Sequence, residues 1–150
     1  MREILFRGKR ADNGEWIYGG ISKSERTGAW FITNMGKDKI GYIGCHEEID
    51  PSTVGQFTGL TDKNGKKIFE WDIVRYQFDN DDCPFPNKHT EKIIGRILFS
   101  DWRSSFSVTA GKNGSDMLNN DLFNYVRNGN RVEVIGNIHD NPELLDHDHH

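Results

Sequence analysis

The sequence is poor in cysteine. Only Cys45 and Cys83 occur, 38 positions apart, and they form no Cys-x-x-Cys pair. Two cysteines are too few for a disulfide framework, so a chain of 150 residues must be held together by its core. Two reduced structural thiols are the simplest interpretation.

Long apolar runs are also absent. No stretch approaches the roughly 20 consecutive apolar residues that span a bilayer, and Met1 is followed by Arg2 and Glu3 without an apolar signal segment. Hydrophobic residues make up 35% of the chain and charged residues 28%, a composition typical of a globular domain. We therefore expect a cytoplasmic protein with no membrane association.

The chain has no excess of basic charge. Its net charge is −4, and residues 101–150 hold four basic side chains against eight acidic ones, while residues 1–100 are balanced. Proteins that grip a phosphate backbone normally carry a basic field. The charge balance disfavours nucleic-acid binding, although local basic faces around Arg2–Arg10 or Lys63–Lys67 stay open.

What the sequence does contain is the alternation of short strands. Apolar and polar residues alternate around Ile4 and Phe6, and Asp12–Glu15 is typical of a hairpin turn before Trp16 and Tyr18. Turn clusters separate the remaining segments. Further strands are predicted over residues 29–33, 40–43, 73–78, 93–99, 106–110 and 132–138.

One helical pattern interrupts the strands. Leu118, Leu122, Phe123 and Val126 recur at helical spacing before a plausible stop at Gly129, which predicts one short helix. Residues 141–145, Asn-Pro-Glu-Leu-Leu, resemble a capped final turn.

Together these signals favour an all-β fold, a small barrel or sandwich, with an antiparallel meander at the N-terminus. We expect a single domain over residues 1–145, with the hairpin and meander in residues 1–50 and the barrel-containing part in residues 51–145. The tail, residues 146–150, lies outside any packed pattern.

Backbone signals are densest between Thr53 and Tyr76. Gly55, Gly59 and Gly65 mark positions for positive φ or close backbone approach, and residues 62–65, Asp-Lys-Asn-Gly, indicate a tight turn. This stretch is therefore rich in residues that determine backbone conformation and poor in residues typical of catalytic sites.

Three segments occur in order along the chain: REILFRGKR at the start, VGQFTGLTDKNGKKIFEWDIV in the centre and EVIGNIHDNPELL at the end. Together they resemble the YopX family of small proteins encoded in bacteriophages and prophages. The resemblance implies a β-rich protein with a barrel similar to SH3-type barrels, located inside an infected or lysogenic bacterium. It also implies that the protein self-associates and that it has no established enzymatic activity.

The sequence departs from the family pattern at one position. The family usually has Glu-Gly-Asp-Ile-Val where this chain has Trp71 between Glu70 and Asp72. Tryptophan disfavours positive φ, so either the position has an ordinary φ or the turn has adjusted. The indole itself is expected to cover the core or to stack on a partner.

Candidate reactive clusters are weak. His46, Glu47, Glu48 and Asp50 could suggest a metal or acid/base site, but their spacing matches no ligand signature, and side chains of a strand and loop splay to different faces. A solvated acidic turn is the preferred interpretation.

Other signatures also fail. Residues 79–82, Asp-Asn-Asp-Asp, begin like a calcium loop whose later ligand positions are wrong, and the serines around Phe106 form no nucleophile elbow. The tail residues His147, His149 and His150 could bind nickel or zinc, but a chain end has no second shell to orient ligands. We predict no catalytic residue, metal or cofactor, and rank a metal-dependent enzyme last.

The preferred function is an interaction module that self-associates or docks a phage or host protein through strand edges and aromatics. Trp71, Arg75 and Trp102 are the predicted partner-binding residues. The alternative is a small barrel that binds single-stranded nucleic acid through these residues and Arg103.

Overall fold

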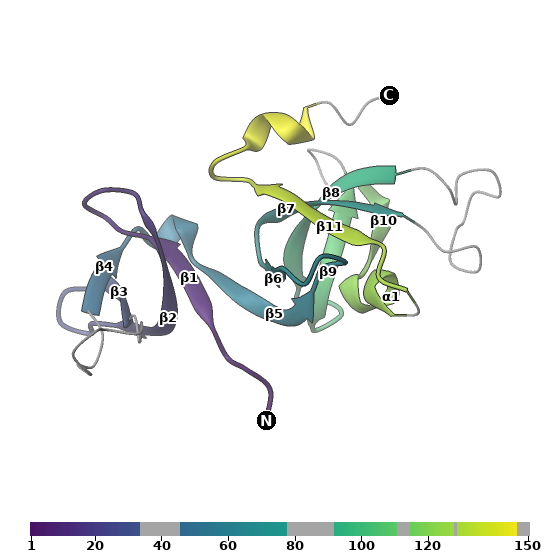
Figure 1. Ribbon diagram of the computed structural model, residues 1–150. Helices are drawn as coiled ribbons and strands as arrows, with labels where there is room; N and C mark the ends of the chain where they lie inside the picture. The colour runs from purple at the N-terminus through teal and green to yellow at the C-terminus, as the bar shows by residue number, and fades with distance from the viewer. Residues whose placement is uncertain (34–45, 78–91, 111–114, 128, 147–150) are drawn as a thin grey trace. The chain divides into compact units, whose positions relative to one another are not determined.

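The structure, a computed structural model, describes residues 1–33, 46–77, 92–110, 115–127 and 129–146, the backbone alone for residues 115–120. Antiparallel strands dominate it, with one short α-helix among the described residues (Figure 1). The all-β prediction is confirmed. The chain divides into two compact units, Met1–Phe57 and Thr58–His150. The single domain predicted over residues 1–145 stays a prediction.

The N-terminal unit is an antiparallel meander in chain order. The predicted turn at Asp12–Glu15 is confirmed: Gly14 has φ 73°, and the amide of Arg10 donates to the carbonyl of Glu15 at 2.9 Å. Its strands are β1 (Phe6–Lys9), β2 (Trp16–Lys23), β3 (Trp30–Thr33) and β4 (His46–Ile49).

The last strand of this meander returns to the first. The amide of Asp50 donates to the carbonyl of Lys9 at 2.8 Å, and the amide of Ala11 donates to the carbonyl of Glu48 at 3.0 Å. Since β4 also pairs with β3, the four strands close on themselves and leave β4 with no long exposed edge. The enclosed core consists of Ile17, Ile32 and Ile49.

A short 3₁₀ turn, η1 (Pro51–Thr53), leads into β5 (Gly55–Thr61), which continues from the first unit into the second. Its first residues pair with β1, and it also neighbours β6 (Lys67–Phe69). The described turn between β5 and β6 holds the Asp-Lys-Asn-Gly signal, as predicted.

The C-terminal unit is built on a five-stranded antiparallel sheet in the order β10-β9-β8-β7-β11. Its core combines one face of the sheet, including Val74 and Tyr76, with Ile68 from β6 and with Leu122 and Tyr125 from the helix. The elements are β7 (Asp72–Gln77), β8 (Lys92–Ser100), β9 (Ser105–Ala110), β10 (Ser115–Asp121), α1 (Leu122–Val126), β11 (Val132–Asn137) and η2 (Pro142–Leu145).

The predicted helix is present but shorter than its pattern. The helical pattern starts at Leu118, but Leu118 lies in β10, and the helix itself begins at Leu122. As a result α1 has only five residues. The final turn at residues 142–145 is a 3₁₀ turn, in which the Asn141 side chain accepts from the Asn137 amide and makes no cap hydrogen bond. No helix in the described part of the chain is long and apolar enough to cross a bilayer.

Several expectations fall on residues that the structure does not describe. These are the strand over residues 40–43, the loop with the Asp-Asn-Asp-Asp run, both cysteines and the tail histidines.

Candidate functional site

Asp62 organises the turn between β5 and β6. Its side chain is only 4% exposed, so its carboxylate needs hydrogen-bond partners. Oδ1 accepts from the amides of Asn64 and Lys66, and Oδ2 accepts from the amide of Val134 in β11, each at 2.9 Å. One buried carboxylate thus shapes the turn and ties it to the outer edge of β11.

Trp71 occupies the turn between β6 and β7 in a left-handed conformation, with φ 70°. The expectation of an ordinary φ is wrong, and the observed φ is one that glycine adopts without strain. Its amide donates to the carbonyl of Ile97 at 2.8 Å, and its carbonyl accepts from Ile138 at 2.9 Å. These bonds to both neighbouring segments hold the backbone there, while the side chain stays half-buried.

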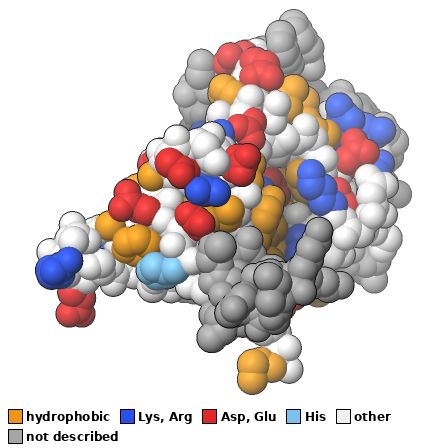
Figure 2. All heavy atoms as spheres, turned by 60° about the vertical axis from the view of Figure 1, so that its left-hand side comes forward, with side chains coloured by type: hydrophobic (Ala, Val, Ile, Leu, Met, Phe, Trp, Pro, Cys, Tyr) orange, Lys and Arg blue, Asp and Glu red, His pale blue; other side chains and the backbone are white. Residues whose placement is uncertain are grey.

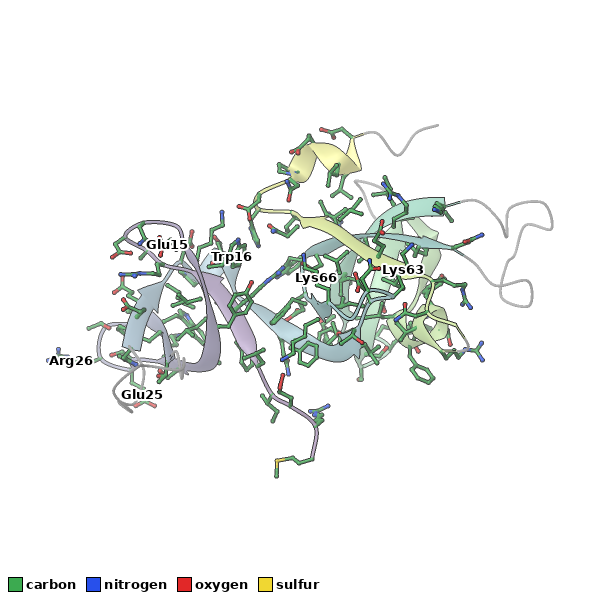
Figure 3. All side chains as sticks on the ribbon, viewed as in Figure 1. Glu15, Trp16, Glu25, Arg26, Lys63 and Lys66 are labelled. Carbon is green, nitrogen blue, oxygen red and sulfur yellow. The ribbon has the colours of Figure 1, made fainter. Side chains whose placement is uncertain are left out.

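Arg75 lies on β7 directly opposite Glu133 on β11. Arg75 Nη1 donates to Glu133 Oε1 at 2.9 Å, and Lys63 Nζ lies 3.6 Å from Glu133 Oε2. The β7–β11 register and the turn between β5 and β6 therefore bring two cations to one carboxylate. Lys63 and Lys66 both lie between β5 and β6, and their side chains project from this turn at separate places (Figure 3).

Arg131 precedes β11 and holds three segments together. Its Nε donates to the carbonyl of Gln77 at 3.0 Å, and its Nη2 donates to the carbonyl of Asn124 at 2.7 Å. The amide of Arg131 donates to the carbonyl of Tyr125 at 2.9 Å. These contacts fix the guanidinium beside the end of β7.

A pocket of about 140 Å³ lies at this place, between the end of β7, the start of β11 and the start of β8. Among the residues that the structure describes, four cations and one carboxylate line this site, which we call the cationic pocket. They are Lys63, Arg75, Lys92, Arg131 and Glu133.

Trp102 lies in the turn between β8 and β9 and is 89% exposed. The guanidinium of Arg103 lies 5.9 Å from its ring centroid and 4.0 Å from Asp121, which also accepts a short hydrogen bond from Ser105. Ser104 adopts a left-handed φ of 53°. The turn therefore has defined anchors although its tryptophan projects into solvent.

Two further aromatic side chains are exposed on elements next to this turn. Phe99, near the end of β8, is 43% exposed and meets Phe106 edge to face, with ring centroids 5.3 Å apart. Phe123 follows Asp121 by two residues and is 59% exposed. Large exposed aromatics in one region are typical of protein contact surfaces.

The three predicted partner-binding residues lie along the sheet and do not share one pocket. Trp71 bonds to Ile97 and Trp102 follows the end of β8, so both lie toward one end of the β7–β8 pair. Arg75 lies farther along β7, opposite Ile94, and lines the cationic pocket. Sequence reasoning missed Lys92, Arg131 and Glu133 and treated Lys63 as a solvated turn residue. These residues are distant in the chain and meet only through strand pairing and the turn between β5 and β6.

The cluster around His46 is divided between two faces of β4, as expected. His46 is exposed and stacks on Phe31 with ring centroids 4.4 Å apart, while Glu47 lies 3.3 Å from Arg10. The pKa of Arg10 is raised, first by its side-chain hydrogen bond to Asp12 and further by the nearby Glu47 charge. Asp50 caps η1 through the amide of Ser52.

No group of three or more His, Cys, Asp or Glu side chains in the described ranges is arranged to hold a metal ion. On the face shown in Figure 2, acidic and basic side chains both occur, interspersed with hydrophobic ones.

The chain is similar to a known protein family and to a solved structure. The YopX protein family matches residues 5–146. Among solved structures, the chain is similar to the crystal structure of protein EF1440 from Enterococcus faecalis, with 26% identity and a TM-score of 0.52, over 97% of this chain and 99% of that one. No curated protein matches the chain. Since the family match spans nearly the whole sequence, the chain belongs to the YopX family.

Proposed function

We propose that this chain is a non-catalytic interaction module that self-associates through the turn between β8 and β9. The observation that carries the proposal is the 89% exposure of Trp102 on a turn anchored through Arg103 and Ser105 to Asp121. An exposed indole on a fixed turn loses little conformational freedom when it docks, and tryptophan is the residue most enriched among interface hot spots.

A second copy of the chain is the occupant we propose, because the YopX resemblance implies self-association. The same resemblance leads us to propose a phage or prophage origin, a site of action inside the bacterial cell and a likeness of the barrel to SH3-type barrels. A phage or host protein is a further partner that the same surface could dock.

The test is light scattering coupled to size exclusion at increasing protein concentration. We expect an oligomer for the wild type and a shift toward monomer for Trp102→Ala, whose association should weaken by roughly 30-fold, the equivalent of about 2 kcal/mol. Tyr18→Ala is the matched control, since it removes an aromatic side chain that is 45% exposed in the N-terminal unit. A monomeric wild type at all concentrations, or equal effects of the two variants, would contradict the proposal.

Single-stranded nucleic-acid binding is the second candidate function. One observation favours it: Arg103 lies beside the exposed ring of Trp102, so a base could stack next to a cation. The net charge of −4 counts against it. Titration with labelled single strands at low salt discriminates the two functions, because nucleic-acid binding must weaken steeply as salt is raised.

A further inference from the structure

The sheet of the C-terminal unit has two buried hydroxyl groups on the face that points away from its core. Val108 of β9 belongs to the core cluster, so its neighbours Ser107 and Thr109 lie on the opposite face of the strand. These two residues are nevertheless only 0% and 4% exposed. Within the described part of the chain, neither hydroxyl has a hydrogen-bond partner. Because a buried hydroxyl without a partner is destabilising, such a pair indicates a binding site.

Arg96 of β8 brings a positive charge to the same face. It lies directly opposite Thr109 in the β8–β9 register, and Ser107 lies opposite Leu98, two residues farther along. Directly paired and diagonal residues on one face of a sheet are within reach of each other, above all when one side chain is long. The Nε atom of Arg96 is buried and, among the described residues, has no hydrogen-bond partner. Three polar groups of adjacent strands therefore share one buried place.

The neighbouring part of this face is buried as well. Ile73 lies opposite Arg96 on β7 and is 0% exposed, although it is not part of the core cluster with Val74 and Tyr76. Leu145 of η2, which contacts β8, is 5% exposed. A ligand that reaches the hydroxyls on this covered face must be small.

We propose that Arg96, Ser107 and Thr109 bind one small monovalent inorganic anion of the size of chloride. The Nε–H group of an arginine only donates, and each hydroxyl can donate one hydrogen bond. An anion accepts from all three groups and balances a guanidinium charge that burial makes costly. A water molecule, the alternative occupant, accepts two hydrogen bonds and leaves that charge unbalanced. This inference does not depend on the proposed self-association, because Trp102 takes no part in the site.

The described carboxylate beside Ser107 already has other contacts. Asp121 of β10 lies opposite Ser107 in the strand register, but it accepts a hydrogen bond from Ser105 and lies 4.0 Å from Arg103. Ser105 and Thr109 are four residues apart in β9, a separation of about 13 Å along the strand. These contacts hold the carboxylate toward the turn between β8 and β9, at the far end from Thr109.

The first experiment is thermal unfolding of the full chain in a chloride series. Ionic strength is kept constant with methanesulfonate, an anion too large for the site. An ion that binds only the folded state shifts the unfolding equilibrium, so Tm should rise with chloride and then level off. A tenfold excess of chloride over Kd corresponds to about a tenfold change in the unfolding equilibrium constant and should raise Tm by about 3 °C.

Two variants locate the site. Thr109→Val removes a hydroxyl and keeps a side chain of similar shape, and Arg96→Met removes the guanidinium. Both should lose the response of Tm to chloride. Without chloride, Thr109→Val should melt no lower than the wild type, because it removes a buried polar group that then has no partner. Thr61→Val is the matched control: Thr61 ends β5 and is exposed, so this variant should keep the full response.

Bromide in place of chloride locates the ion directly in crystals of the wild type, because bromide scatters anomalously. We expect one anomalous peak within hydrogen-bond distance of Arg96 Nε and the hydroxyls of Ser107 and Thr109. This measurement keeps the test decisive if a variant does not fold.

A wild-type Tm that does not respond to chloride would overturn the proposal. So would equal responses of Thr109→Val and Thr61→Val, or an ordered water at the site in crystals that contain bromide. A bromide peak without any response to chloride in solution would indicate an adventitious ion only and would also reject the site.

Discussion

At the scale of single residues, two buried aspartates in the segment from Thr53 to Tyr76 hold the backbone in its turns. Asp62 satisfies three amides from a buried position, and Asp72, 2% exposed, accepts from the amide of Phe69 at 2.8 Å. A buried carboxylate is tolerated only where hydrogen bonds replace its lost hydration. The two aspartates lie before and after β6, and the carboxylate of each holds a turn of the backbone through its hydrogen bonds.

Trp71 carries a conformational cost that a glycine there would avoid. A left-handed residue with a Cβ costs about 1–2 kcal/mol relative to glycine. Its hydrogen bonds to Ile97 and Ile138 hold it in place despite that cost.

We predict that Trp71→Gly is more stable than Trp71→Ala by about 1 kcal/mol, because both lose the indole and alanine alone keeps the φ penalty. Urea unfolding followed by fluorescence measures the difference. Trp16, half-buried in β2 and absent from the positive-φ residues, is the control: there alanine should be the more stable variant. An alanine variant at position 71 as stable as the glycine variant would contradict the interpretation.

At the scale of elements, the N-terminal meander depends on close packing between strands. A Cβ atom at Gly19 of β2 would overlap the backbone carbonyl of Thr33 in β3, which cannot move aside cheaply. At the neighbouring Gly20, a Cβ would meet nothing within 4 Å. Two adjacent glycines of one strand therefore serve different purposes.

Gly19→Ala is expected to destabilise the protein by about 2 kcal/mol or more, while Gly20→Ala should leave stability unchanged or raise it by up to about 1 kcal/mol. Thermal and urea unfolding of the two variants, which differ only in position, measures this contrast. Equal effects would show that the register of β2 on β3 differs from the one described.

At the scale of the whole molecule, contacts between residues close in the chain could be predicted from the sequence, and contacts between distant residues could not. The turn at residues 12–15 and the turn around Asp62 follow from residues adjacent in the chain. The sequence pattern assigns Leu118 of β10 to the helix, because its spacing continues into α1. The cationic pocket could not be predicted, since Arg75 and Glu133 meet only through the pairing of β7 with β11, 58 positions apart.

The most direct measurement of the central claim is ¹⁹F NMR of the protein labelled with 5-fluorotryptophan, recorded over a concentration series. The chain has four tryptophans, and the resonance of Trp102 is identified by its absence from Trp102→Phe. We predict that this resonance shifts or broadens as concentration rises, while those of Trp16, Trp30 and Trp71 change little. The account would be contradicted if the protein associates while the Trp102 resonance neither shifts nor broadens.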